Sequence, residues 1–392
     1  MKFALFALTM TGIMLMMHYA VFRSTISFFQ ISRPGVRYLL YGAMVLLSFS
    51  FITAFVAIHW RENPWTIAYY RFAAVWTGFL IHSLSAAAAA WVLLGACRLA
   101  GIGLPIKSIG MIMLALAVMA SGYGLWSAFH PVVRYVSVPV AHLPEAWKNS
   151  KIAVLSDLHL GLMHQQGFAR QTVKTVNRLK PDLVLITGDL VDGMGGPYKD
   201  NLKPLNDLKA KHGLFFVTGN HEHYVGIEKA LQLIEKTPLR VLDNEAVEIN
   251  GLELLGISYP GIGSVADLRN FTQEKTSGTV RIVMFHTPTE MGMHKEAIRD
   301  QHLANYWMPD TRFITNRDLN ADLQISGHTH GGQIFPFQFL TRWLYRGHDH
   351  GLKKIDDFCL YTTSGTGSWG PPMRTAGRPE IAVLRLVKNQ GK

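Results

Sequence analysis

Long apolar runs dominate the first third of the chain. Four can be drawn, over residues 3–22, 38–59, 72–97 and 109–128. Each has about the 20 residues that a helix needs to cross the hydrocarbon core of a bilayer. The first run has no clear small-residue cleavage site, so we expect a retained helix rather than a signal peptide. The pattern predicts about four transmembrane helices within residues 1–129.

After residue 150 the pattern changes to short apolar runs that alternate with amphipathic stretches. Strand-like runs fall at 151–156, 182–187, 213–218, 279–285, 322–326, 358–363 and 380–386. Helical patterns lie between some of them, at 166–180 and 225–236. Buried strands alternating with helices predict a layered α/β domain over residues 151–392. Residues 130–150, which contain Pro131 and Pro144, are interpreted as a connector.

Composition supports this division of the chain. Charged residues make up 17% of the whole, against about 25% in an ordinary soluble domain. Residues 1–129 contain eight Lys or Arg and one acidic residue, whereas the rest contains 30 and 26. This balance argues against a purely soluble protein, a disordered chain and a disulfide scaffold. The two cysteines, Cys97 and Cys359, do not indicate a redox compartment.

The net charge of +11 divides into +7 for the first third and +4 for the remainder. Basic loops between apolar runs are typical of a multi-pass membrane protein. Residues 130–392 show no basic stripe, so we expect no nucleic-acid partner. The basic residues on the two sides of the membrane are balanced, five against five. With the N-terminus and inter-helix loops alone, the rule favours an extracytoplasmic C-terminal domain. The oligomeric state is not indicated.

Polar side chains follow five of the strand-like runs. Because ligands of open α/β sheets bind outside the carboxyl ends of the strands, we expect these side chains to meet at one edge. Gly-Asp or Asp-x-His alone is weak evidence, Gly-Asn-His-Glu is moderately specific and Gly-His-Thr-His more so. All five in this order indicate a metal site. They are Asp157 and His159, Gly188-Asp189, Gly219-Asn220-His221-Glu222, His286, and Gly327-His328-Thr329-His330.

The residue types at these strand ends indicate which ions could bind. Carboxylate and amide oxygens with imidazole nitrogens, and no thiolate, suit Mn, Fe or Zn. An aspartate has two oxygens and can bridge two ions. Ions about 3.5–4 Å apart clamp the attacking and leaving oxygens of a displacement, and they lower the pKa of bound water to give hydroxide near neutral pH.

The motif order DLH, GD, GNHE, H and GHTHGGQ resembles the calcineurin-like metallophosphoesterase superfamily. Within it, the chain is most similar to bacterial membrane-associated phosphoesterases with N-terminal transmembrane helices. The resemblance covers about residues 133–388, and Ser364-Gly-Thr-Gly with Pro379-Glu380 also resembles this branch. It implies a four-layered α/β/β/α sandwich with the metals at the strand ends.

The resemblance also implies roles for the residues of these motifs. Two divalent metal ions are expected, Mn²⁺ first, with Fe or Zn as alternatives. His221 would contact the phosphoryl oxygens or protonate the leaving group, and Glu222 would orient it. Asp189 would bridge the ions. Asp157, His159, Asp189 and His330 would hold the first ion, and Asn220, His286 and His328 would complete the second.

The activity that follows is metal-dependent hydrolysis of a phosphodiester or pyrophosphate bond. A lipid-linked substrate is expected, such as a molecule like UDP-diacylglucosamine, which relatives in lipid A synthesis cleave. Two alternatives stay open. One is a nucleotide phosphodiesterase that acts on a soluble substrate and uses its helices only as an anchor. The other is a non-catalytic membrane sensor with a metal-binding domain.

Two segments leave the choice of substrate open. Residues 294–319 form either a lid over the substrate pocket or a surface excursion. The second segment mixes aromatic residues with arginines, as a contact with a membrane surface does, although packing in the domain core explains its aromatic residues equally well. These residues are Phe335, Phe337, Phe339, Arg342, Trp343, Tyr345 and Arg346.

Overall fold

The computed structural model describes residues 2–259, 275, 278–288, 320–355 and 357–389. The segment 294–319 lies outside the described residues. The chain forms two compact units. The helical unit comprises Met1–Ser127, Ile334–Pro336 and Gly370–Thr375. The sandwich unit comprises Ala128–Gln333, Phe337–Trp369 and Ala376–Lys392.

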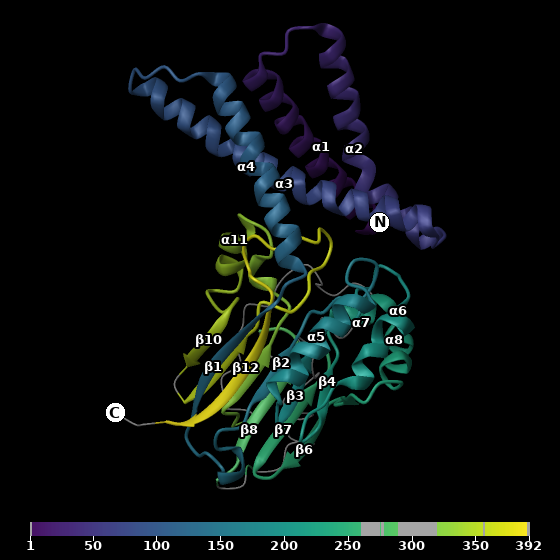
Figure 1. Cartoon of the computed structure of the whole chain (residues 1–392), viewed down its shortest axis with the longest axis vertical. Coiled ribbons are helices and arrows are strands. Elements are labelled where there is room, and N and C mark those ends of the chain that lie inside the picture. The colour runs from purple at the N-terminus through teal and green to yellow at the C-terminus, as the bar shows by residue number, and fades with distance from the viewer. Residues whose placement is uncertain (1, 260–274, 276–277, 289–319, 356, 390–392) are drawn as a thin grey trace. The chain divides into compact units, whose positions relative to one another are not determined.

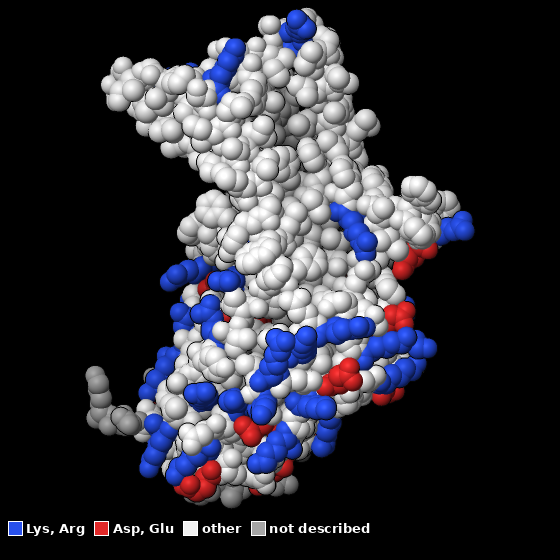
Figure 2. Space-filling view, viewed as in Figure 1, with Lys and Arg blue, Asp and Glu red and all other residues white. Residues whose placement is uncertain are grey.

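Four helices make up most of the helical unit: α1 (Lys2–Phe29), α2 (Pro34–Trp60), α3 (Pro64–Leu99) and α4 (Ile106–Ala128) (Figure 1). Among the described residues, the three helices α2, α3 and α4 are long and apolar enough to cross a membrane. We expected about four such helices. Figure 2 shows that this unit carries few charged side chains, as its composition requires.

Small and polar residues of the helical unit lie where the helices pack. Ala87 and Ala90 of α3 are buried in one cluster with Phe28 of α1, because small side chains let helices approach closely. The imidazole of His82 is buried and lies 3.0 Å from the hydroxyl of Ser121 on α4. The imidazole of His82 therefore has a hydrogen-bond partner inside this unit, as most buried polar groups do.

Two short segments from the C-terminal half of the chain also belong to the helical unit. Ile334 and Met373 pack in one cluster with Ile81 of α3. The hydroxyl of Thr375 lies 2.9 Å from the second ring nitrogen of His82. The domain boundaries expected from the sequence did not include this exchange of segments.

The sandwich unit contains two six-stranded mixed sheets. The first has the order β1 (Val132–Val140), β12 (Glu380–Lys388), β2 (Ile152–Leu155), β3 (Leu183–Thr187), β4 (Leu214–Val217), β5 (Arg240–Val241). The second has the order β10 (Gly351–Ile355), β11 (Phe358–Thr362), β9 (Leu323–Ser326), β8 (Val280–Phe285), β7 (Leu252–Ile257), β6 (Glu245–Ile249). Each predicted strand-like run contains one of these strands.

Alternation of side chains along the strands creates two apolar layers. Val154 of β2 and Leu185 of β3 face the core between the two sheets. Ala153 and Ile186, one residue away on the same strands, face the other side, where they pack with Phe168 of α5. The helices α5 (Gln166–Leu179), α6 (Tyr198–Leu202), α7 (Asn220–Val225) and α8 (Ile227–Ile234) flank the first sheet (Figure 1). The α/β class expected from the sequence is confirmed.

The expected connector 130–150 contains a strand. Residues 132–140 form β1, which pairs in parallel with β12 along its whole length. Val138 and Val140 are buried in the core between the sheets. Pro139 is compatible with this strand because β1 lies at the edge of its sheet, where no ladder bond is needed on the outer side.

A buried carboxylate ties the two sheets together. Glu380, the first residue of β12, is fully buried and accepts hydrogen bonds from Arg134 of β1 at 2.6 Å and from Tyr361 of β11 at 2.7 Å. It also accepts one from the hydroxyl of Thr363 at 2.9 Å. These partners come from both sheets, so this one side chain fixes the end of β12 against each of them.

We therefore predict that Glu380→Ala destabilises the sandwich unit by about 3–5 kcal/mol, because it leaves buried donors without their acceptor. Chemical denaturation of the full chain in detergent measures the effect. The matched control is Glu145→Ala, which removes an exposed carboxylate from a surface pair with Lys148, and its unfolding midpoint should not move. Equal midpoints for both variants would contradict the assigned role of Glu380.

Candidate metal centre

All the predicted ligands belong to the sandwich unit and follow the carboxyl ends of its central strands. Asp157 and His159 follow β2, Asp189 follows β3, and Asn220 begins α7 after β4. His286 follows β8, while His328 and His330 follow β9. Parallel strands deliver their carboxyl ends to one edge, which is where the sequence placed the site. All of these side chains are buried except that of His328, which is partly exposed.

Two glycines allow the loops to approach this closely. A Cβ atom at Gly327 would collide with the side chains of Ser156 and Asp157. A Cβ atom at Gly219 would collide with the carboxylate of Asp189. Glycine is therefore required at both positions for the backbone to pass beside the carboxylates.

Backbone strain is concentrated at the candidate ligands. Five of them adopt positive φ angles, which cost free energy for any residue with a side chain and cluster at functional sites. The surrounding structure must hold these residues in place, since their own preferences oppose the conformation. The angles are 53° at Asp157, 47° at His159, 53° at Asp189, 71° at His328 and 52° at His330.

The first group of ligand atoms comes from β2 and β9. The Nε2 atoms of His159 and His330 lie 3.1 Å apart. The Nε2 atom of His330 is 3.4 Å from Oδ1 of Asp157. Together these three residues could hold a metal ion, since all three ligand atoms are within reach of one point.

The second group comes from β3, β4, β8 and β9. The Nδ1–H of His286 donates to the carbonyl of Thr187 at 2.8 Å, which turns Nε2 toward the other candidate ligands. That Nε2 lies 3.2 Å from Oδ2 of Asp189 and 3.2 Å from Nδ1 of His328. The side-chain oxygen of Asn220 is 2.9 Å from the same His328 nitrogen. Asp189, His286 and His328 could hold a second ion.

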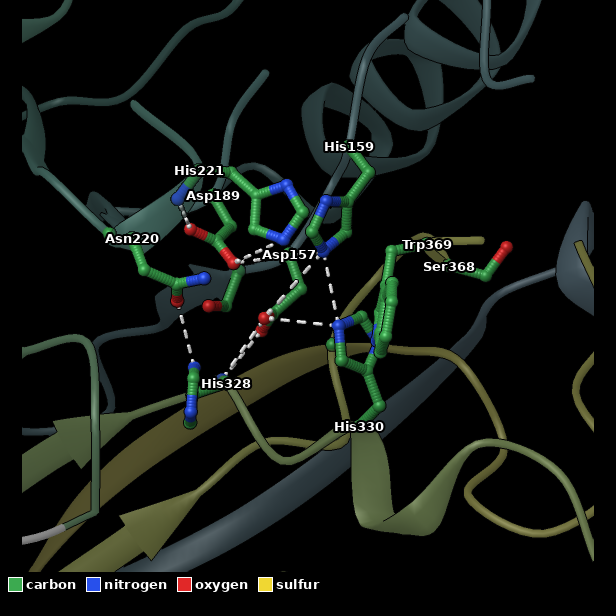
Figure 3. A network of polar contacts seen from close by, with 12 residues as sticks. Asp157, His159, Asp189, Asn220, His221, His328, His330, Ser368 and Trp369 are labelled. Atoms are coloured by element: carbon green, nitrogen blue, oxygen red, sulfur yellow. Dashed lines mark hydrogen bonds and ion pairs between the residues drawn. The ribbon is translucent and has the colours of Figure 1, made fainter. Parts of the chain in front are cut away.

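Asp189 belongs to both neighbourhoods. Its Oδ2 atom, which faces His286, is also 3.8 Å from Nε2 of His159 in the first group. Figure 3 shows the labelled ligands pointing toward one another around Asp157 and Asp189. Carboxylate oxygens, an amide oxygen and imidazole nitrogens thus point toward the same place from different strands. This donor set suits a divalent cation.

The charges of the site reflect the same crowding of acceptors. Burial by itself lowers the pKa of His286, but the adjacent Asp189 carboxylate outweighs it and raises the pKa to about 9. Burial tends to raise the pKa of Asp189, but His286 and His221 hold it well below its usual value. Burial and the neighbouring His286 lower the pKa of His328 to about 3. The Asp189 carboxylate therefore favours a positive charge beside it. A bound divalent cation would also supply that charge.

His221 lies beside these two groups and could form a third group of ligand atoms with His159 and Asp189. Its Nδ1–H donates to the carbonyl of Asp192 at 2.5 Å, and its Nε2 lies 3.9 Å from Oδ2 of Asp189. The ring packs edge-on against His159, with centroids 4.4 Å apart. His221 therefore presents Nε2 to the ligand cluster.

Glu222 does not have the role that the sequence suggested for it. We expected it to orient His221, whose Nδ1 is instead bonded to the backbone of Asp192. The buried carboxylate of Glu222 accepts backbone N–H groups from Gly219 at 2.6 Å, Asp189 at 3.0 Å and Leu190 at 2.8 Å. Glu222 therefore holds together two of the loops that carry candidate ligands, the loop after β3 and the loop after β4.

Sequence reasoning missed Asp192 and Trp369 at the site, and it named Tyr345 only as one aromatic residue of the segment after the last motif. Asp192 is buried, with Oδ1 3.5 Å from Nδ1 of the ligand His159. Tyr345 is buried with its ring 6.4 Å from that of His328, and burial raises the pKa of its hydroxyl. Trp369 lies 6.3 Å from His221, ring to ring. An aspartate three residues after Gly-Asp is the one local signal, and such residues are common in turns.

The fold and the site together define an α/β sandwich with a candidate metal centre at its strand ends. Residues 150–332 match the calcineurin-like phosphoesterase family. The chain therefore carries a calcineurin-like phosphoesterase domain, which confirms the resemblance stated above.

Several known proteins are similar to this chain over about two thirds of its length. An uncharacterised metallophosphoesterase of Helicobacter pylori is 36% identical over 255 residues, which cover 64% of this chain and 63% of that protein. A transmembrane protein with a metallophosphoesterase domain from Danio rerio is 31% identical over 294 residues, covering 70% and 62%. A metallophosphoesterase of Aquifex aeolicus is 29% identical over 283 residues, covering 70% and 99%. The chain thus spans less than two thirds of the first two relatives.

We predict that Asp192→Ala weakens Mn²⁺ binding by about 10- to 100-fold, because the carboxylate beside a ligand imidazole orients it and raises its basicity. Calorimetric titration of the metal-free full chain in detergent measures the dissociation constant. The control is Asp200→Ala, which removes an exposed carboxylate of α6. An unchanged constant in Asp192→Ala would show that this carboxylate does not support His159.

Metal affinity should also depend on pH. With its pKa near 9, His286 is protonated at neutral pH and must lose that proton to coordinate an ion. The apparent association constant for Mn²⁺ should therefore rise by about tenfold per pH unit up to about pH 9 and level off above it. Titrations at several pH values, in buffers of different ionisation enthalpy, count the proton released. A flat profile would exclude His286 as a protonated ligand of the metal-free centre.

Proposed function

We propose that the protein is a membrane-anchored, multi-pass phosphoesterase with two metal ions, which hydrolyses a phosphodiester or pyrophosphate bond of a lipid-linked substrate. The observation that carries the proposal is the position of Asp189 between two groups of ligand atoms. Its Oδ2 is 3.2 Å from Nε2 of His286 and 3.8 Å from Nε2 of His159. A carboxylate so placed can serve two ions at once.

The residues divide between the two ions by proximity. In this proposal Asp157, His159 and His330 hold the first ion, and Asp189 contributes to both. Asn220, His286 and His328 hold the second. Ions of this kind polarise a phosphoryl oxygen and lower the pKa of bound water. Mn²⁺ is the proposed metal, with Fe or Zn as alternatives, because the donors are carboxylate, amide and imidazole.

His221 is the proposed proton-carrying residue. Its Nδ1–H is fixed on the carbonyl of Asp192, so Nε2 is the atom that meets the substrate. Burial lowers the pKa of His221, and the nearby Asp189 partly opposes that shift. With Nδ1 occupied, Nε2 is the atom through which the imidazole can pass a proton to a leaving oxygen.

A lipid-linked substrate is supported by the apolar helices of the same chain. Three of them are long and apolar enough to cross a membrane in the part that the structure describes. An anchor of this kind keeps the phosphoesterase domain close to lipid headgroups at all times. A non-catalytic sensor is disfavoured because the Asp and His side chains at the strand ends lie close enough together to hold metal ions.

The test is hydrolysis of bis-p-nitrophenyl phosphate by the full chain in detergent with added Mn²⁺. We expect metal-dependent turnover that falls by at least about 100-fold in Asp189→Asn, because changes beside metal ligands already cost that much. Asp200→Asn, an exposed carboxylate of α6, serves as the control and should retain activity. Equal activity in both variants would rule out the proposed centre.

A comparison of substrates then separates the two catalytic readings. A phospholipid diester in nanodiscs should be turned over faster than a soluble nucleotide diester at equal concentration. Preference for the nucleotide would favour the soluble-substrate phosphodiesterase. Absence of turnover for both, in folded protein that binds Mn²⁺, would favour the sensor.

A further inference from the structure

We propose that α11 (Phe337–Leu344) docks the sandwich unit on an anionic lipid surface, with its apolar residues Phe339, Leu340 and Trp343 inserted at the boundary between headgroups and acyl chains. Binding of lipid by this α11 surface does not depend on the proposed function. The further statement that the docked lipid is also the substrate rests on the proposed function.

The first argument is exposure. None of the eight residues of α11 is buried. Trp343 is 73% exposed, Phe339 65% and Leu340 51%. Large apolar side chains gathered on one short helix mark an interaction site when they face solvent. Tryptophan in particular is enriched where membranes meet water.

The second argument is charge, which selects lipid over another protein copy. Arg342 and Arg346 are exposed on and just after α11. The sequence from Gln333 to His348 contains no acidic residue. Aromatic side chains interleaved with arginines bind anionic lipid surfaces. A symmetric contact between two copies would bring these arginines together instead, with no acidic residue from this segment to neutralise them.

The third argument is covalent. Pro336 ends the segment Ile334–Pro336, which belongs to the helical unit, and Phe337 begins α11. Successive Cα atoms are about 3.8 Å apart. The start of α11 is therefore tethered to the unit that contains the membrane-spanning helices, which keeps a bilayer within its reach.

The fourth argument connects this surface to the metal centre. The short helix η3 (His330–Gly332) starts at a candidate ligand and ends five residues before α11. Gly332 packs so closely on Gln338 of α11 that a Cβ atom would collide with its backbone. Tyr345, which follows α11, packs on the ring of His328. A lipid bound along α11 therefore has its headgroup beside two ligand-bearing segments.

Depth measurements on spin-labelled protein test the docking directly. Nitroxides are placed at Phe339→Cys and Trp343→Cys in the full chain with Cys97 and Cys359 replaced by alanine. The control is Tyr135→Cys, since Tyr135 is also an exposed aromatic residue of the sandwich unit, on edge strand β1. Nanodiscs contain one chain each and a mixture of phosphatidylcholine and phosphatidylglycerol.

We expect labels at 339 and 343 to be accessible to oxygen and shielded from a soluble nickel complex, whereas the label at 135 meets the nickel complex freely. Equal nickel accessibility at all three positions would overturn the proposal. A second result would also overturn it: strong dipolar broadening between the labels at 339 of two chains in detergent, which is lost when the apolar residues of α11 are replaced. That result identifies a second copy of the chain as the occupant.

A kinetic comparison connects docking to catalysis. The double variant Phe339→Ser/Trp343→Ser should lower kcat/KM for a phospholipid diester in nanodiscs by at least about tenfold. The reason is that it removes the apolar side chains that the bilayer buries in this proposal. Its hydrolysis of bis-p-nitrophenyl phosphate should be unchanged, as should both activities of Tyr135→Ser. If the chain hydrolyses no phosphodiester, the proposed function fails, while the depth measurement still decides whether α11 binds lipid. Equal loss on both substrates would show damage to the metal centre instead of lost docking.

Discussion

The buried carboxylate of Glu222 is the interaction on which the rest of the centre depends. It accepts backbone N–H groups from the loop after β3, at Asp189, Leu190 and Val191, and from Gly219 after β4. Two loops from different strands are thereby held by one side chain. Burial and the nearby Asp189 raise the pKa of Glu222 to about 7. The four N–H donors oppose that cost, because charge-assisted hydrogen bonds are among the strongest in proteins.

Further backbone bonds extend this brace to the remaining strands. Once Glu222 fixes the loops, the N–H of His221 donates to Asp189 at 2.8 Å. The N–H of His328 donates to Asp157 at 3.0 Å. The N–H of Gly367 in turn donates to the carbonyl of Asp157 at 2.9 Å. Each carboxylate ligand is therefore positioned by a backbone donor from a neighbouring loop, which explains how strained positive φ angles persist at five ligands.

The sequence predicted these strands and the positions of the candidate ligands relative to them, because both are local signals. A buried strand is an apolar run, and a candidate ligand lies two residues beyond its carboxyl end, as with Asp157 after β2 and Asp189 after β3. Convergence then follows from topology. The edge strand β1 was less visible, because Arg134 and Pro139 interrupt its apolar pattern and its stability comes from pairing with β12, more than 200 residues away.

Contacts made only in three dimensions could not be predicted. Nothing in the sequence around Asp192 shows that its carboxylate faces His159 or that its carbonyl holds His221. The same applies to Ile334 and Met373, which look like ordinary apolar residues of the α/β domain but pack against Ile81. A pattern reports which residues are buried, and it does not report which partner buries them.

The chain leaves the sandwich unit close in sequence to a candidate ligand of the metal centre. The chain leaves the sandwich unit after Gln333 and again after Trp369, and the first exit lies three residues beyond His330. The side-chain amide of Gln333 donates to the carbonyl of Trp369 at 2.8 Å, and its oxygen accepts the N–H of Trp369 at 3.3 Å. The N–H of Ala376, where the chain returns, donates to the carbonyl of Gln333 at 3.1 Å. Trp369 and Ala376 are thus both hydrogen-bonded to Gln333 inside the sandwich unit. At each of these three residues the chain leaves or re-enters that unit. Gln333 is therefore held in place by hydrogen bonds three residues beyond the candidate ligand His330.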